Sequence, residues 1–276
     1  MTWHATLHLH YTRQDQRTVA HYHHEGPLRV LQSLYPEGDA VCHNVLVHPP
    51  GGLVGGDTLA IKIEVQADAH GLVTTPGATR FYKSATEPAV QSVHARLAPD
   101  ARLEWLPLEA LAYNQCRAEN KAVFELAPGA ELMGWDITAL GLPEAGQPFV
   151  EGTFAQHIEV PGVWREQGRI DATDLRLMDG PLGLAGQRCM ATLFFVAGQP
   201  IERQRREQAL EMVRSLIDGH TLRASAGATS PHPQVLVLRV LAPLVEPALD
   251  LLKQARAAWR QQLWALEAVP PRVWAT

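Results

Sequence analysis

The sequence is poor in cysteine and has no long apolar segment. Its three cysteines, Cys42, Cys116 and Cys189, lie far apart and form no C-x-x-C pair. This argues against a disulfide framework or a structural zinc site and favours a reducing cytoplasm. No apolar run approaches the roughly 18 residues of a membrane span, and a formal charge of −5 gives no general nucleic-acid signal. We therefore expect a cytoplasmic protein that binds neither membranes nor nucleic acids.

Familiar catalytic motifs are also missing. There is no G-x-S-x-G, no H-E-x-x-H, and no G-x-G-x-x-G after a strand. The nearest match to a phosphate loop has Gly51 and Gly56 at the Walker A spacing, but Asp57 stands where the lysine belongs. A carboxylate at that position would repel phosphate, so a structural turn is the better interpretation. A nucleotide-dependent hydrolase is the alternative.

Glycine and proline are concentrated in one stretch, which reads HPPGGLVGGD over 48–57. Glycine permits positive φ and the close approach of another backbone, whereas proline fixes φ. The stretch therefore specifies a backbone path rather than a packed face. We interpret Gly51, Gly52, Gly55 and Gly56 as a structural loop.

Short strand patterns recur at a regular spacing in the first part of the chain. A small-residue turn followed by an apolar run occurs at Ala69, Ala101 and Ala130, which are separated by 32 and 29 residues. Such a period indicates stacked β-units, as in a β-helix; a meandering sandwich is the alternative. Further β-patterns lie at 61–65, 89–97, 121–126, 152–160, 174–177 and 190–196.

The pattern becomes helical in the last quarter of the chain. Apolar residues at helical spacing predict an amphipathic helix over 202–218. A second helix is predicted over 244–266, with Pro247 in its first turn. Between them, the apolar run 234–241 predicts a buried strand.

These patterns together predict a mainly β fold of β-helix-like stacked strands with two C-terminal helices. We expect a single domain over 1–276, with a β-rich body over 1–200 and a helical layer over 201–276 that contains one buried strand. No linker or low-complexity segment divides the chain.

Histidine is concentrated at the N-terminus, where six of the thirteen histidines lie within the first 24 residues. This region is typical of two strands joined by a polar turn. His8 and His10 would share one face of the first strand, and His21 and His23 one face of the second. Two such pairs on adjacent strands could hold a soft divalent metal through imidazole nitrogen. Solvent-facing histidines near a strand edge are the alternative.

Three carboxylates stand within apolar runs, namely Glu104, Glu109 and Asp136. A buried carboxylate is unfavourable unless it is paired or hydrogen-bonded. Strand alternation could place each one in solvent. Alternatively, these groups line a polar interior, where they could act as acids or bases or coordinate passing cations.

Six short motifs follow one another from about residue 24 to the C-terminus. They are GPLRV (26–30), YPEG (35–38), HPPGGLVGGD (48–57), TTPGATRFYKS (74–84), LEWLP (103–107) and PPRVWAT (270–276). In this order they resemble the UreD (UreH) family of urease accessory proteins. Each motif is short, but jointly they are specific.

The resemblance implies a scaffold chaperone that has no catalysis of its own. It implies binding to the urease apoprotein and to UreF, and recruitment of the GTPase UreG through UreF. It also implies that nickel passes transiently through an internal, water-filled tunnel to the urease active site, with no tightly bound cofactor. A soluble nickel buffer without a scaffold role is the alternative.

Residues in or beside the motifs become candidates for tunnel lining or partner contact: Glu37, Asp57, Ser84, Glu109 and Asp136. A conduit needs weak, multiple sites, because a tight cage would trap the ion. Two departures from the family pattern put the local lining in doubt. Leu108 stands where a polar residue is more usual, and 113–116 lacks an acidic group near Asn114.

Overall fold

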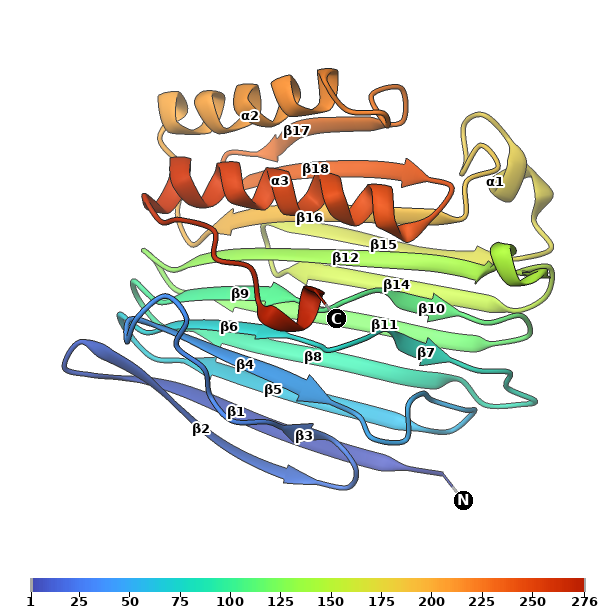
Figure 1. Ribbon diagram of the computed structural model, residues 1–276, viewed down its shortest axis with the longest axis horizontal. Helices are drawn as coiled ribbons and strands as arrows, with labels where there is room; N and C mark the ends of the chain where they lie inside the picture. Colours follow the sequence, from blue (N-terminus) through green and yellow to red (C-terminus); the bar gives the residue numbers. More distant parts are fainter. Residues whose placement is uncertain (1, 276) are drawn as a thin grey trace.

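In the computed structural model, which describes residues 2–275, the chain winds between two β-sheets that lie face to face (Figure 1). The winding forms a β-solenoid of about four turns. Strands β1, β5, β8, β11 and β14 of one sheet are parallel, as are β4, β6, β9 and β12 of the other. A meander would pair its strands antiparallel. The predicted β-helix-like stacking is therefore confirmed.

The bounds of the strands follow the order of each sheet. The seven-stranded sheet contains β15 (Trp164–Asp171), β14 (Thr153–Val160), β11 (Arg117–Leu126), β8 (Ala89–Leu97), β5 (Thr58–Val65), β1 (His4–Gln14) and β2 (Arg17–Glu25). The main path of the second sheet is β17 (Ala226–His232), β18 (Val235–Ala242), β16 (Cys189–Ala197), β12 (Glu131–Leu142), β9 (Arg102–Leu106), β6 (His70–Thr74), β4 (Val41–Val47) and β3 (Arg29–Val30). Beside this path lie β7 (Thr79–Phe81), β10 (Ala110–Ala112) and β13 (Gln147–Pro148).

The sequence repeat marks equivalent turns of the solenoid. Ala69, Ala101 and Ala130 are each at most 1% exposed, and each donates its N–H to the carbonyl three residues earlier. The residue before each alanine has a positive φ: Asp68, Asp100 and Gly129. The turns stack, because the carbonyls of Ala69 and Ala101 accept hydrogen bonds from the residues that follow Ala101 and Ala130. The period in the sequence is therefore the length of one coil.

Two long helices cover the outer face of the second sheet. Helix α2 (Arg203–Asp218) and helix α3 (Val245–Trp264) pack against each other, and α3 lies over β16 and β18 (Figure 1). Both helices were predicted, to within two residues at each end. The predicted buried strand is also confirmed, because β18 lies between β16 and β17.

The prediction of a strand at 174–177 is wrong, because this segment forms the N-cap and the start of helix α1 (Leu175–Asp179). Asp174 is its N-cap, and its carboxylate accepts a hydrogen bond from the N–H of Leu177 at 3.0 Å. Four residues of alternating polarity are too few to separate a strand from one helical turn, whereas the N-cap aspartate is a helix signal. Short 3₁₀ segments complete the fold at Pro143–Ala145 and Arg272–Ala275.

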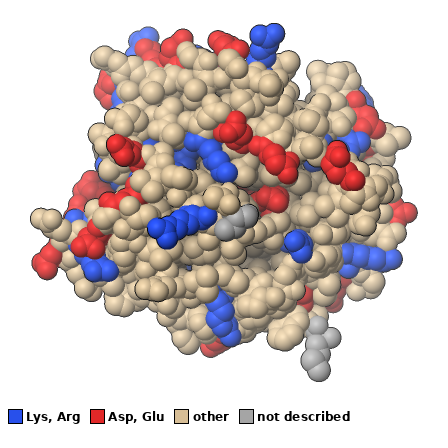
Figure 2. Space-filling model, viewed as in Figure 1, with Lys and Arg blue, Asp and Glu red and all other residues tan. Residues whose placement is uncertain are grey.

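Two apolar cores result from this arrangement. One fills the space between the two sheets, and the other lies between the second sheet and the helices. Figure 2 shows acidic and basic side chains interspersed over the face that carries α3. Within residues 2–275, no helix is long and apolar enough to cross a membrane.

Candidate functional site

A row of polar side chains crosses the otherwise apolar space between the two sheets. On the first sheet, the amide of Gln91 on β8 donates to Asn120 Oδ1 on β11 at 3.2 Å. Asn120 Nδ2 in turn donates to Asp136 Oδ1 on β12 of the second sheet at 2.9 Å. Gln156 on β14 and Thr138 on β12 donate to the other oxygen of Asp136. Hydrogen-bonding groups from three strands, β11, β12 and β14, therefore converge on one interior carboxylate, and β8 is linked to it through Asn120.

Asp136 is the centre of this row. Its carboxyl lies between the sheets, although the residue as a whole is only half-buried. Burial raises the pKa of Asp136 to about 6, and the charge of Glu166 adds to the rise. Hydrogen bonds from Thr138, Gln156 and Asn120 oppose it. The carboxyl can therefore exchange a proton near neutral pH.

One end of the row reaches solvent beside β15, the edge strand of the seven-stranded sheet. Glu166 on β15 accepts a hydrogen bond from Thr192 on β16 at 3.2 Å. It also pairs with Arg239 on β18 at 2.6 Å. The Arg239 side chain is 49% exposed. This ion pair therefore bridges the two sheets at the outer limit of the row.

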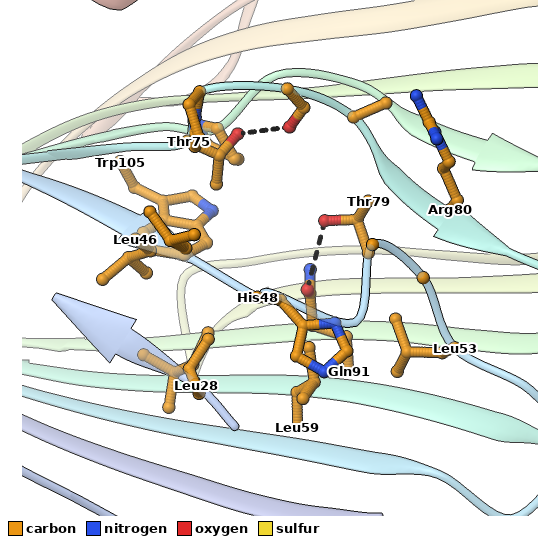
Figure 3. Close-up of a pocket in the computed structure, with 18 residues that line it drawn as sticks. Leu28, Leu46, His48, Leu53, Leu59, Thr75, Thr79, Arg80, Gln91 and Trp105 are labelled. Atoms are coloured by element: carbon orange, nitrogen blue, oxygen red, sulfur yellow. Dashed lines mark hydrogen bonds between the residues drawn. The ribbon is translucent and has the colours of Figure 1, made fainter. Parts of the chain in front are cut away.

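The other end of the row opens into a cavity of about 260 Å³. Figure 3 shows His48, Thr79 and Gln91 among its lining residues, and Thr79 donates to Gln91 Oε1 at 3.4 Å. The Nε2 atom of His48 is buried without a hydrogen-bond partner. Burial lowers the pKa of His48, and Asp57 offsets part of the shift. A neutral imidazole is thus available as a ligand beside the polar row.

The groups of the row are of kinds that can bind cations. The row offers amide and hydroxyl oxygens, one imidazole and spaced carboxylates, which are ligands for hard and borderline cations. No three His, Cys, Asp or Glu side chains of residues 2–275 are arranged to hold a metal ion.

Asp57 and Ser84 lie at the glycine loop, outside the row. Both oxygens of Asp57 are occupied, one by the N–H of Trp3 at 2.7 Å and the other by the N–H of Val54 at 2.9 Å. Ser84 is buried beside Gly55. The carboxylate of Asp57 therefore fixes the backbone of this loop.

The glycines are required here by close contacts and by φ. A Cβ on Gly55 would lie 2.8 Å from the carbonyl oxygen of Glu87, and one on Gly52 would lie 2.2 Å from the ring of Tyr82. Gly51 and Gly56 have φ of 78° and 88°. The loop leads into strand β5 and not into a helix. A phosphate loop needs a helix N-terminus, so the nucleotide interpretation is wrong.

Glu37 belongs to a buried ion-pair network under α3. It accepts a hydrogen bond from Arg260 at 2.6 Å and contacts His43 Nε2 at 2.6 Å. Burial would raise the pKa of Glu37, but His43 and Arg260 outweigh it and lower the pKa. Glu37 therefore joins helix to sheet.

Glu109 lies in a crevice formed by β10, the start of α3 and the C-terminal segment. Its pKa is raised, chiefly by burial and further by the nearby charge of Glu246. The five candidates thus lie in four places, and only Asp136 belongs to the polar row.

The N-terminal histidines lie as predicted on two antiparallel strands. His8 is opposite His23 and His10 is opposite His21 in the β1–β2 register.

Asn114 lies in the segment 113–116, which lacks the acidic group that the family pattern would place there. Its Oδ1 atom accepts hydrogen bonds from the N–H groups of Val150 and Glu151. Asn114 therefore anchors a turn.

Comparison with known proteins identifies the family. A family model described as UreD urease accessory protein matches residues 4–275. The chain belongs to the UreD family of urease accessory proteins. The urease accessory protein UreD of Paracidovorax citrulli is 65% identical over 275 residues, and that of Variovorax paradoxus is 64% identical over 276 residues; both alignments cover all of both chains. The UreD of Leptothrix cholodnii is 54% identical over 278 residues, again covering both chains. The resemblance seen in the six motifs is confirmed, and membership of the UreD family implies a role in urease maturation.

Sequence reasoning missed most of the polar row. His48 was noted only as part of a turn, and Gln91, Asn120, Gln156 and Glu166 were not singled out. Gln91 and Gln156 stand on strands whose other inward residues are apolar. A polar residue at a position where strand alternation expects an apolar one is therefore a weak signal for such a row. Strand alternation alone cannot show which face is inward.

Proposed function

We propose that this UreD-family chain is a scaffold for urease maturation that conveys nickel through its interior. In this proposal it binds the urease apoprotein and UreF, and it recruits the GTPase UreG through UreF. Nickel is cargo in transit, not a resident cofactor, and the chain itself performs no catalysis. We place this process in the cytoplasm, which suits the three buried free cysteines at positions 42, 116 and 189.

The observation that carries the proposal is the polar row from the cavity at His48 to the Glu166–Arg239 edge. A row of this kind is unfavourable for the stability of an apolar core, because each polar group must be hydrogen-bonded. Its presence across strands of both sheets is therefore best explained by passage of a polar species. A divalent cation fits the middle of the row, because Asp136 offers a carboxylate there and its partners Asn120, Gln156 and Thr138 carry amide or hydroxyl oxygens.

The central carboxylate explains how a cation could bind and leave. Asp136 has a pKa of about 6, so it is ionised when a cation approaches at neutral pH and is not locked in an ion pair. Asn120 and Gln156 can present either an N–H or an oxygen, because rotation of the amide exchanges the two. The row can therefore hold a proton, water or a cation with small side-chain movements.

The test is urease activation in cells that lack this gene, with the protein restored as wild type or as Asp136→Asn. We expect Asp136→Asn to copurify with UreF and to lower urease activity and its nickel content. Asp68→Asn is the matched control, because Asp68 is exposed in a turn with a φ of 60° that asparagine also adopts. Full activation by Asp136→Asn would refute conduction through the row, and full activation without the protein would refute the scaffold role.

A further inference from the structure

The edge hairpin β1–β2 carries a histidine array that lies outside the polar row. His10 lies opposite His21, and His8 lies opposite His23. The apolar residues of β1 are buried, so its alternate residues, which include both histidines, point to the outer face of the sheet. Directly opposed residues share a face, with Cβ atoms about 4.5–5.5 Å apart. Four imidazoles therefore form a two-by-two array on the surface.

The two rows of this array have different neighbours on the adjacent strand β5. His10 lies beside Glu64, whereas His8 lies beside Lys62. The first row is therefore His21, His10 and Glu64 on three adjacent strands, which combines two imidazoles with one carboxylate. The second row ends in an ammonium group, which repels a cation. His23 of the second row moreover already contacts Glu25 at 3.8 Å, so only the first row combines two unpaired imidazoles with an unpaired carboxylate.

The side chains of the first row are unpartnered. His10, His21 and Glu64 make no side-chain hydrogen bond or ion pair with any of residues 2–275. The Nε2 atom of His10 is moreover shielded from solvent. A shielded ring nitrogen without a partner is uncommon in folded proteins, and a metal ion would satisfy it.

Other histidines on the outer face of the same sheet differ in this respect. His94 on β8 contacts Glu125 at 2.6 Å, and His157 on β14 contacts Glu159 at 2.7 Å. Each of these two surface imidazoles is thus paired with a carboxylate. The unpaired state of the first row is a local property and not a general feature of this surface.

We propose that His10, His21 and Glu64 form a surface site for a first-row divalent cation such as Ni²⁺. As the side chains stand they do not converge on one point, and rotation of the exposed His21 and Glu64 side chains toward His10 completes the site. Water fills the remaining coordination positions. The strands fix the spacing of the three residues, so binding orders only their side chains. The proposal is independent of urease maturation.

The experiment is calorimetric titration of the full-length, untagged protein with NiCl₂ at about pH 7.5. We expect His21→Ala to weaken Ni²⁺ binding by at least about tenfold and Glu64→Gln to weaken it less, because an imidazole is the stronger ligand for this ion. Mg²⁺, which prefers oxygen ligands, should give no heat.

Matched variants separate this site from its surroundings. His94→Ala removes a histidine from the same face, and His23→Ala removes one from the second row; both should bind Ni²⁺ as the wild type does. Asp136→Asn should also leave the affinity for Ni²⁺ unchanged. The proposal of a surface site can therefore be refuted while that of interior conduction holds, and interior conduction can be refuted while the surface site holds. Equal affinity of His21→Ala and the wild type, equal losses in His21→Ala and His23→Ala, or no Ni²⁺ binding by the wild type would overturn the proposal.

Discussion

Glu104 on β9 and Arg256 on α3 form an ion pair of 2.8 Å in which both side chains are at most 2% exposed. The same carboxylate contacts His70 at 3.2 Å and Arg260 at 3.6 Å. Burial would raise the pKa of Glu104, but Arg256, together with His70 and Arg260, holds it well below its usual range. Helix α3 is therefore fixed to the solenoid by buried charges as well as by apolar packing.

Replacing Glu104 by glutamine should lower the free energy of unfolding by about 3–5 kcal/mol, because it leaves the buried guanidinium of Arg256 without its carboxylate, whereas Arg260 keeps Glu37. Urea denaturation followed by circular dichroism measures the change. Arg203→Ala is the control, since the Arg203–Glu207 pair is exposed on α2 and should change stability little. A loss below about 1 kcal/mol for Glu104→Gln would mean that water reaches this network.

Acidification should destabilise the protein through His70. Burial lowers the pKa of His70, and its contact with Glu104 offsets only part of the shift. The unfolded chain therefore binds a proton at the ordinary value of about 6.5, whereas the folded chain does so at lower pH. The stability that His70 contributes is complete above about pH 6.5 and is lost as pH falls through that value toward the folded pKa.

Denaturation at pH 7 and pH 5 tests this dependence. His70→Gln keeps a hydrogen-bond donor near Glu104 but removes the titration, so its stability should fall less steeply with acidification. One proton contributes at most about 1.4 kcal/mol per pH unit. Identical pH profiles for the wild type and His70→Gln would assign the acid sensitivity to other groups.

The sequence predicted those parts of the fold that repeat or have a period. The turns at Ala69, Ala101 and Ala130 recur because every coil makes the same turn. Helix α3 was predicted because a stripe of apolar residues has the 3.6-residue period. Helix α1 was not, because five residues carry too little periodicity. Regular local structure can thus be recognised from a single sequence.

The candidate site was predicted less well, because it depends on contacts between distant residues. Glu37 and Arg260 are 223 residues apart, and no local pattern connects them. Asp57 stood out as an acid among glycines, but only the backbone path shows that both its oxygens accept hydrogen bonds from N–H groups. Asp136 was selected as an acid in an apolar run, and the structure places it between the sheets. Its partners Asn120 and Gln156 were missed, because their inward direction depends on strand register.

Two glycines of the loop should differ in their tolerance of alanine. A Cβ on Gly55 would clash with backbone, 2.8 Å from the Glu87 carbonyl oxygen, so Gly55→Ala must displace that segment. Gly51 has open space around its Cβ position, so Gly51→Ala meets only the strain of a φ of 78°, about 1–2 kcal/mol. Thermal denaturation should give the lower Tm for Gly55→Ala. The reverse order would show that the loop relaxes around residue 55.

Asp136→Asn should make the protein more stable at pH 8. A carboxyl whose folded pKa is about 6, against about 3.9 in the unfolded chain, destabilises the fold once it is ionised. This penalty develops as pH rises from about 4 to 6 and is complete above that range, where it is on the order of 3 kcal/mol. Asparagine keeps the shape without the charge, and Asn120 and Gln156 can reverse their amides to meet it.

The pH dependence of this gain identifies its cause. Denaturation at pH 8 should show Asp136→Asn to be more stable than the wild type, and the difference should vanish near pH 4, where the wild-type carboxyl is protonated. A variant that is less stable at pH 8 would instead make Asp136 a structural anchor of the interior. Greater stability combined with weaker urease activation would mean that the carboxylate destabilises the fold and is retained for what it binds, as expected of a functional residue.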